Sequence, residues 1–340
     1  MPQIQQPQCS SSFMKIEASE ASSRIREQLF KNQLAIKRIA NRLMDYQPQS
    51  VMFVGRGSSD HAGTFAKYLI EIEIGIPTFC AAPSVATIYN RSLQLNNTLV
   101  IIVSQSGRSP DILEQAKQAK AAGALCIALL NDEEAPLADL VDFVIPLSVG
   151  IEKSVAATKS YLATLSALLQ LIAYWKNDSM LIAALSEIPK ALDNAHKAET
   201  QLDFDFLKGV KNLVVLGRGF GFAIGNEIAL KLKEVCAIHA ESFSSAEFLH
   251  GPVALVDENF KVLDVLFQDE SKQCHQSQVD EIKRRGANVV KLHQVDCKLH
   301  PRIAALAVLQ RFYLDIEKIA VKRGINPDLP RGLKKVTKTI

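Results

Sequence analysis

The strongest chemical signal in the sequence is residues 103–111, which read VSQSGRSPD. Pro110 suits the first turn of a helix and Ser109 suits its N-cap. A helix N-terminus presents unpaired backbone N–H groups and the positive end of the helix dipole, so it is a natural place for a phosphate. The segment therefore predicts a phosphate-binding loop; the alternative is a well-capped Ser/Gly turn without a ligand. Arg108 is a candidate for added charge. The polar or small residues of the loop are Ser104, Gln105, Ser106, Gly107 and Ser109.

Two Gly-Arg-Gly turns raise the question of a nucleotide cofactor. The loop at 103–111 lacks the lysine of a nucleotide P-loop. The turn at Gly55-Arg56-Gly57 has Asp60 where a dinucleotide fingerprint has its third glycine, and no acidic residue ends the next strand at 79–81. The turn at 217–219 is followed by Gly221 and much later by Glu241, which is also an imperfect match. We therefore expect no NAD, FAD or other cofactor.

The elements that must position the loop alternate between strands and helices. Short runs that are apolar on both faces are typical of parallel strands covered by helices, and they occur at 51–54, 99–103, 125–130 and 143–147. Helical spacing of apolar residues is found at 14–46, 60–74, 110–122 and 156–174. This alternation predicts βαβ units and a doubly wound α/β domain.

The same pattern begins again in the second half of the chain. A strand at 213–216 leads into Gly217-Arg218-Gly219, which matches the first turn at an offset of 162 residues, and Gly225 matches Gly63 at that offset. A single match could arise by chance, but strand, turn and later glycine together favour a duplication. We expect further elements at 228–235, 262–267, 289–292 and 303–321. The expected plan is a disordered N-terminus (1–13), a helical segment (14–50), a first domain (51–180), a connection (181–205), a second domain (206–325) and a C-terminal tail (326–340).

Composition excludes several classes of protein. The chain has 340 residues, of which 48% are hydrophobic and 22% charged, so it is not disordered as a whole. A net charge of +3 argues against a nucleic-acid or anionic-membrane partner. No apolar run reaches the ~20 residues of a membrane span, and no signal peptide is evident. The six cysteines are widely separated, so we expect reduced thiols, a cytoplasmic location and no metal.

Several motifs resemble those of sugar isomerase (SIS) domains. Ser104-Gln105-Ser106-Gly107, preceded by Gly57-Ser58-Ser59, looks like the SIS pattern, and two copies in tandem resemble the isomerase half of glucosamine-6-phosphate synthase. The segments LKLKE, IHAE, EFLHGP and LPRGLKKV at 230–234, 238–241, 247–252 and 329–336 strengthen the likeness. The resemblance implies two homologous, flavodoxin-like SIS domains with parallel sheets covered by helices, and a hexosamine phosphate as the small-molecule substrate.

The resemblance also implies roles for individual residues. Phosphate would be held by Ser104, Gln105, Ser106 and Ser109, while Ser59 and the backbone from Val155 to Ala157 would line the sugar. Glu234 would be the proton-transfer base and Lys335 a lysine on a closing C-terminal tail. His250 would open the sugar ring from a neighbouring subunit, which implies a homodimer.

The local sequence is compatible with these roles. Lys231 and Glu234 are three residues apart and share a helix face, so the lysine could hold Glu234 ionised; the alternative is a surface pair. Ser244 and Glu247 form a capping-box pattern, and the helix it opens would end near His250, where the dipole favours imidazolium. The alternatives are that His250 is an ordinary residue at a helix end and that the C-terminal lysines belong to a solvated tail. His61, near the first turn, is a minor candidate for substrate contact.

Two departures from the synthase pattern shape the functional prediction. Ala157 stands where the family has a serine contact, and no glutamine-hydrolysing domain precedes Met14. The chain is therefore more similar to stand-alone glucosamine-6-phosphate deaminases, which release fructose 6-phosphate and ammonia without metal or nucleotide. Alternatives are another aldose–ketose isomerase, a fructosamine-6-phosphate deglycase, or a non-catalytic sugar-phosphate sensor. The sequence does not choose between glucosamine and galactosamine, and it assigns no role to Lys334.

Overall fold

The computed structural model describes residues 11–335 of the chain. A long helix, α1 (Phe13–Tyr46), opens this part, and the side chain of Ser12 caps it by accepting a hydrogen bond from the Lys15 amide. Phe13 is therefore helical and Ser12 is the N-cap, so the helix begins one residue before the expected start at Met14. Residues 1–10, which make up most of the predicted N-terminal segment, and residues 336–340, the end of the predicted tail, lie outside the described residues.

The first sheet has five parallel strands in the order β2-β1-β3-β4-β5. The strands are β1 (Ser50–Val54), β2 (Thr78–Cys80), β3 (Thr98–Ser104), β4 (Leu125–Leu130) and β5 (Phe143–Pro146). The helices that connect or cover them are α2 (Ser58–Glu73), α3 (Pro83–Thr87), α4 (Pro110–Ala121), η1 (Ala138–Leu140) and α5 (Lys159–Lys176). Phe53 and Ile101 belong to one hydrophobic core and Met52 and Val100 to another, because both faces of the sheet are covered.

The second sheet has four parallel strands in the order β7-β6-β8-β9. The strands are β6 (Asn212–Gly217), β7 (His239–Ser244), β8 (Lys261–Leu266) and β9 (Asn288–His293). Its helices are α9 (Phe220–Cys236), α10 (Ser245–Phe248), η2 (Pro252–Leu255), α11 (Lys272–Arg284) and α12 (Ala304–Lys322). Sequence analysis did not predict β7, because its polar residues hide the strand pattern.

The two Gly-Arg-Gly turns have the same conformation, which supports the duplication. Gly57 has φ +56° and ψ −127° before α2, and Gly219 has φ +55° and ψ −122° before α9. Positive φ favours glycine at both positions. A Cβ on Gly63 would lie 2.6 Å from the ring of Phe53, and one on Gly225 would lie 3.4 Å from Val215. These helix–strand contacts are equivalent, since Phe53 and Val215 are also 162 residues apart.

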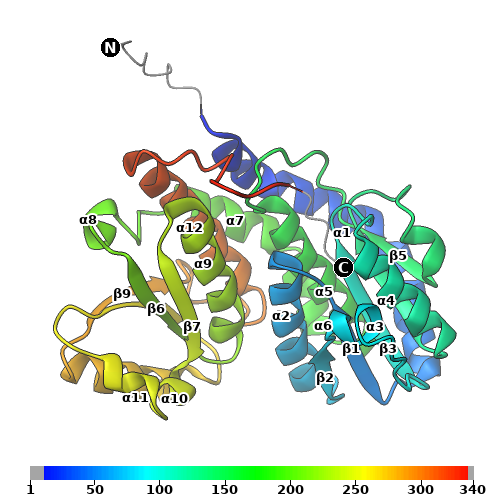
Figure 1. The fold of residues 1–340 in the computed structure, drawn as a ribbon. Coiled ribbons are helices and arrows are strands. Elements are labelled where there is room, and N and C mark those ends of the chain that lie inside the picture. Colours follow the sequence, from blue (N-terminus) through cyan, green and yellow to red (C-terminus); the bar gives the residue numbers. More distant parts are fainter. Residues whose placement is uncertain (1–10, 336–340) are drawn as a thin grey trace.

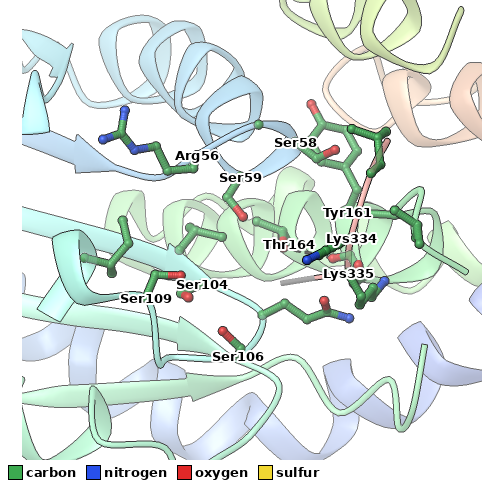
Figure 2. Close-up of a pocket in the computed structure, with 18 of the residues that line it drawn as sticks. Arg56, Ser58, Ser59, Ser104, Ser106, Ser109, Tyr161, Thr164, Lys334 and Lys335 are labelled. Atoms are coloured by element: carbon green, nitrogen blue, oxygen red, sulfur yellow. Dashed lines mark hydrogen bonds between the residues drawn. The ribbon is translucent and has the colours of Figure 1, made fainter. Parts of the chain in front are cut away.

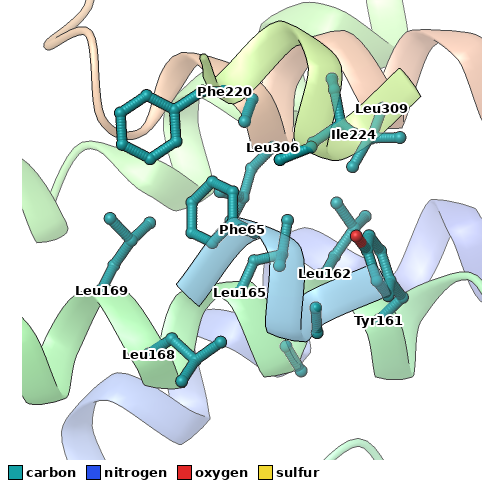
Figure 3. Close-up of a cluster of buried hydrophobic side chains, with 14 of the residues drawn as sticks. Phe65, Tyr161, Leu162, Leu165, Leu168, Leu169, Phe220, Ile224, Leu306 and Leu309 are labelled. Carbon is teal, nitrogen blue, oxygen red and sulfur yellow. The ribbon is translucent and has the colours of Figure 1, made fainter. Parts of the chain in front are cut away.

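A shared helical layer joins the two domains (Figure 1). The connection contains α6 (Ser179–Leu185), α7 (Ile188–Lys197) and α8 (Phe204–Leu207), and α7 packs against both α1 and α12. In the centre, α2 and α5 of the first domain pack against α9 and α12 of the second (Figure 3). The rings of Phe65 and Phe220 lie 5.2 Å apart across this boundary. Side chains of α9 are thereby held over the first domain.

Candidate active site

A cavity of about 570 Å³ opens at the carboxyl ends of β1 and β3 (Figure 2). Crevices at this end of parallel strands are the usual ligand sites of such sheets. Nine of the eleven residues predicted for the site line the cavity: Ser59, Ser104, Gln105, Ser106, Ser109, Val155, Ala157, Glu234 and Lys335. The other two, Lys231 and His250, do not line it. Ser84, Ser160, Tyr161 and Thr164 line the cavity as well, and sequence analysis had not singled them out.

The loop after β3 has the geometry of an anion site. The Gly107 amide donates to Ser104 Oγ at 3.0 Å, and Gly107 has φ +59°. A Cβ at this glycine would lie 2.6 Å from that of Ala135, so the loop requires glycine. Ser109 is the N-cap of α4 and Pro110 is at its start, as predicted, but the Ser109 side chain makes no capping hydrogen bond. Its hydroxyl therefore remains available to the cavity.

A different arginine than expected lines the cavity near this loop, and each of the two arginines is paired with a carboxylate. Arg108, the candidate from the sequence, pairs with Asp132 at 2.8 Å and does not line the cavity. Arg56, from the first Gly-Arg-Gly turn, lines the cavity and lies 2.8 Å from the buried carboxylate of Asp111. The signal that points to Arg56 is its place directly after β1, since the ends of β1 and β3 are neighbours.

Lys231 and Glu234 form a buried ion pair rather than a surface pair. The Lys231 side chain is completely buried, and its Nζ lies 2.6 Å from Glu234 Oε2. Glu234 is 19% exposed and reaches the cavity. A second carboxylate, Glu227 Oε1, lies 3.1 Å from the same nitrogen. Sequence analysis missed Glu227, although its position four residues before Lys231 places it on the same helix face.

Glu227 is the centre of a buried polar cluster. It accepts hydrogen bonds from Ser58 Oγ at 3.1 Å and Tyr313 at 3.4 Å, and His61 Nδ1 lies 3.2 Å from it. Burial raises the pKa of Glu227, but Lys231 and His61 outweigh it and hold the pKa below its usual value. Burial lowers the pKa of Lys231, but Glu227 and Glu234 raise it above its usual value. The lysine is therefore a cation held between two carboxylates. His61 serves this cluster and does not line the cavity.

The C-terminal tail reaches the cavity through Lys335. Its Nζ lies 3.0 Å from Glu152 Oε2 and donates to the Ser154 carbonyl at 2.7 Å. Lys335 is thus not part of a solvated tail, whereas Lys334 is exposed and lines the cavity edge. Glu152 is fully buried, and no sequence pattern distinguishes it from a surface loop residue. The Val155 amide donates to the Asp328 carbonyl at 3.1 Å, so this part of the predicted sugar-facing backbone already binds the tail.

His250 is exposed and lies outside the cavity of its own chain. The helix before it, α10, has only four residues, and η2 follows at Pro252. Ser244 is the N-cap of α10 but makes no capping hydrogen bond with its side chain; its hydroxyl accepts from Arg218 at 3.4 Å. The prediction that Ser244 is the N-cap is therefore confirmed, but the predicted capping hydrogen bond from its side chain is wrong.

Within residues 11–335, no group of three or more His, Cys, Asp or Glu side chains is placed to hold a metal ion. The five cysteines in this range are free thiols. No helix in the same range is both long and apolar enough to cross a membrane.

Comparisons with known proteins agree with this architecture. The SIS domain model matches residues 46–174 and 206–296. Glutamine–fructose-6-phosphate aminotransferase (isomerizing) of Sulfurisphaera tokodaii is 30% identical over 84% of the chain and 49% of its own length, so the chain spans about half of this curated relative.

Solved structures give the same result. A protein of Silicibacter pomeroyi DSS-3, named as a candidate phosphosugar isomerase, has a TM-score of 0.88 at 37% identity, covering 93% of this chain and 100% of that one. The C-terminal domain of glucosamine-fructose-6-phosphate aminotransferase from Francisella tularensis has a TM-score of 0.85 at 26% identity, covering 94% and 99%. The chain belongs to the SIS domain family and is homologous to the isomerase half of these aminotransferases.

Proposed function

We propose that the protein is a glucosamine-6-phosphate deaminase that converts its substrate and water to fructose 6-phosphate and ammonia. The observation that carries the proposal is the position of Glu234: this carboxylate, clamped by Lys231, faces the same cavity as the hydroxyls of the loop after β3. A carboxylate over a tethered carbon chain is suited to proton transfer between neighbouring carbons.

In this mechanism the phosphate binds at Ser104, Ser106 and Ser109, where the start of α4 presents N–H groups. The hydroxyls and the helix dipole favour the dianion, and Arg56, which is paired with the buried Asp111, lines the same end of the cavity. Binding at this end directs the carbon chain toward Glu234.

Chemistry begins once the sugar ring is open. His250 of a second subunit would protonate the ring oxygen and give the open-chain aldehyde with its amine at C2. Glu234 then removes the proton from C2 and returns it to C1, while the C2 amine gives up one proton and the oxygen on C1 gains one. The product is an imine at C2, with no net oxidation.

Water completes the reaction. It adds to the C2 imine carbon, the C–N bond breaks, and nitrogen leaves as ammonia to give the ketone of fructose 6-phosphate. Lys335, on the tail, would bind the open-chain oxygens or exchange with the imine through a Schiff base. Release of ammonia, rather than its uptake, is part of the proposal.

The names of two similar proteins agree with the choice of substrate. The aminotransferase relatives act on fructose 6-phosphate by name, and a glucosamine-6-phosphate deaminase from Thermotoga maritima shares the fold, with a TM-score of 0.79 at 23% identity. The homodimer, the hydrolytic activity and a cytoplasmic location are parts of the same proposal.

The decisive test is a panel of sugar phosphates in which ammonia and ketose phosphate are measured together. Glucosamine 6-phosphate should give both in equal amounts. A ketose without ammonia would indicate an aldose–ketose isomerase, and an amine other than ammonia from a fructosamine 6-phosphate would indicate a deglycase. Binding without any product would indicate a sensor. Each of these outcomes would overturn the proposed activity.

A further inference from the structure

A chain of buried polar side chains connects three elements of the second domain. Its central residue is His275, on α11. The imidazole Nε2 lies 2.7 Å from Asp264 Oδ1, on β8, and Nδ1 lies 2.9 Å from the hydroxyl of Ser245, the first residue of α10. Asp264 and Ser245 are 0% exposed and His275 is 2% exposed. None of the three lines the cavity, so this chain lies outside the site described above.

The hydrogen bonds of this chain fix the start of α10. A carboxylate accepts and does not donate, so His275 Nε2 donates to Asp264. The other oxygen of that carboxylate has no hydrogen-bond partner in the part of the chain that the structure describes. The hydroxyl of Ser245 also donates to Gln278 Oε1 at 2.6 Å. The first residue of α10 is thereby bonded to two residues of α11, one of which is itself bonded to β8.

The first domain shows that the fold does not require polar residues at these positions. At the offset of 162 residues, β8 corresponds to β3 and α11 to α4. Asp264 then corresponds to Ile102, which is a buried residue of a hydrophobic core. His275 corresponds to Leu113, which packs against that same core. Burial of a carboxylate and an imidazole costs free energy that an apolar pair does not. Stability alone therefore does not account for the polar chain.

The helix α10 depends on contacts of this kind for its position. It has four residues, and a single helical turn is not stable by itself because helix nucleation is unfavourable. Its last residue, Phe248, is buried, with its ring 5.6 Å from Phe243 and 6.1 Å from Phe260. Its first residue, Ser245, is bonded to the neighbouring helix α11 (Figure 1). An aromatic anchor alone would allow the turn to rotate about Phe248, and the polar anchor at the other end prevents this.

The backbone connects α10 directly to His250. The Leu249 amide donates to the Ala246 carbonyl at 3.1 Å, and the His250 amide donates to the Glu247 carbonyl at 3.0 Å. The histidine therefore continues the turn, and its side chain is exposed. A rotation or displacement of α10 would move His250 with it.

We propose that Ser245, held by His275 and Asp264, is a positioning residue that fixes α10 and thereby the direction in which His250 is presented to a second subunit. The inference rests on the proposed function in giving His250 a role in the active site of that subunit. It adds to that function three buried residues of the second domain that never touch the substrate.

Hydrogen exchange at the amides of Leu249 and His250 tests the anchor without requiring turnover. Ser245→Ala removes both side-chain hydrogen bonds from α10 to α11. Loss of this anchor should raise the exchange rate of the two amides about tenfold, while amides in α12 keep their rates. Ser277→Ala, which removes an exposed hydroxyl from α11, is the control and should exchange as the wild type does. Unchanged exchange in Ser245→Ala would overturn the inference.

A double variant tests the part played by His275. Asp264→Ile with His275→Leu installs the residues of the first domain. Replacement of a buried polar pair by apolar residues is often neutral or stabilising, so the free energy of unfolding should be no lower than that of the wild type. Exchange at the same two amides should still rise, because Ser245 keeps only its bond to Gln278. Wild-type exchange would remove His275 from the proposal, and a clear loss of stability would show that the chain serves the fold itself.

Kinetics separate positioning of His250 from a general loss of structure. The proposed phosphate loop is in the other domain, so Ser245→Ala should leave KM within about twofold. It should lower kcat about tenfold or more, as displacement of a catalytic group by about 1 Å can do. A raised KM with an unchanged kcat would contradict the assigned role. Ser245→Ala also keeps the inference open to refutation if the double variant does not fold, since it changes one small side chain.

Mixed dimers assign the defect to one subunit. Ser245→Ala and Glu234→Gln chains in equal amounts should start with at most about a twentieth of the wild-type activity and return about a quarter after exchange, because hybrids combine an intact Glu234 with a correctly held His250. Ser245→Ala with His250→Asn should gain nothing, since both defects concern the same histidine.

The mixtures also distinguish this inference from the proposed function. If Glu234→Gln recovers activity with His250→Asn but not with Ser245→Ala, the shared site stands and the positioning role is refuted. If Glu234→Gln recovers activity with neither variant, the shared site of the proposed function has failed, and the amide exchange of Ser245→Ala alone decides whether the polar chain fixes α10.

Discussion

The ammonium nitrogen of Lys231 lies 2.6 Å from a carboxylate oxygen of Glu234, in a position where the lysine is completely buried. The lysine therefore contacts Glu234 from the protein interior, while the carboxylate faces the cavity. This contact fixes the orientation of the carboxylate that we propose to accept a proton from carbon. Ser58 Oγ, 3.1 Å from the same nitrogen, connects this pair to the first domain.

Replacement of the proposed base should abolish turnover and preserve binding. We expect Glu234→Gln to lower kcat by about 10²- to 10⁴-fold, the usual contribution of a general base. The affinity for a non-reacting sugar phosphate such as glucitol 6-phosphate should stay within about twofold, since the phosphate loop is unchanged. Calorimetric titration and the ammonia assay measure the two quantities. Activity near that of the wild type would remove Glu234 from its role.

Removal of the buried cation should cost stability unless a carboxylate is removed with it. Lys231→Met leaves Glu227 buried without its countercharge, and breaking a buried pair in this way costs about 3–5 kcal/mol. The double variant Glu227→Gln with Lys231→Met should recover part of that loss. The free energies of unfolding in urea provide the comparison. A Lys231→Met protein as stable as the wild type would show that the charges do not interact as the distances indicate.

Burial raises the pKa of Glu152, but the charge of Lys335 and two further hydrogen-bond donors outweigh burial and hold the pKa below its usual value. This shift predicts how the contribution of Glu152 to stability depends on pH. A carboxyl group whose pKa is lowered by folding stabilises the folded state above its unfolded value of 4.5, and the contribution is lost as pH falls below it. The difference in unfolding free energy between the wild type and Glu152→Gln should therefore be constant from about pH 5 to 7 and shrink from pH 4.5 downward. Urea titrations across this range test the prediction. A difference that grew on acidification would contradict the assigned direction of the shift.

The elements of the fold were predictable because their signals are local. Apolar runs gave the strands, and the repeated Gly-Arg-Gly turn gave the duplication, since the close contacts of Gly63 and Gly225 leave little room for other residues. The β7 strand was not predicted from the sequence, because only Ala240 of its six residues is buried. Strands with exposed polar residues carry no period that distinguishes them from loops.

The site was predictable where a motif carries it and not where tertiary contact creates it. Ser104 and Glu234 lie in segments with family patterns. Glu152 and Glu227 have partners from distant segments, and nothing in the neighbouring sequence marks a carboxylate as buried. Arg108 was a candidate and Arg56 was not singled out for the same reason, because only the fold shows that Asp132 binds the first and that the second lines the cavity.

The serine hydroxyls of the phosphate loop should control substrate affinity. Each lost hydrogen bond to a charged oxygen costs about 1.5–3 kcal/mol, so Ser104→Ala combined with Ser106→Ala should raise KM on the order of a hundredfold or more. Ser166→Ala is a matched control, because the Ser166 hydroxyl is buried in α5 without a hydrogen-bond partner among the described residues. Steady-state kinetics on all three proteins decides the matter. An unchanged KM for the double variant would place the phosphate elsewhere.

His250 should act in the active site of a second copy of the chain. It is exposed and does not line the cavity of its own chain, whereas Glu234 does. If the dimer places His250 of one subunit beside Glu234 of the other, a hybrid of Glu234→Gln and His250→Asn subunits contains one site with both defects and one site with none.

Each variant alone should be nearly inactive, and a mixture allowed to exchange subunits should recover activity. With random exchange, half of the dimers are hybrids with one intact site each, so about a quarter of the wild-type activity should return. Ammonia release measured before and after mixing tests this, and size-exclusion chromatography with light scattering confirms that dimers are present. A mixture no more active than its components would show that His250 does not cross between subunits. A protein that remained fully active as a monomer would rule out the shared site altogether.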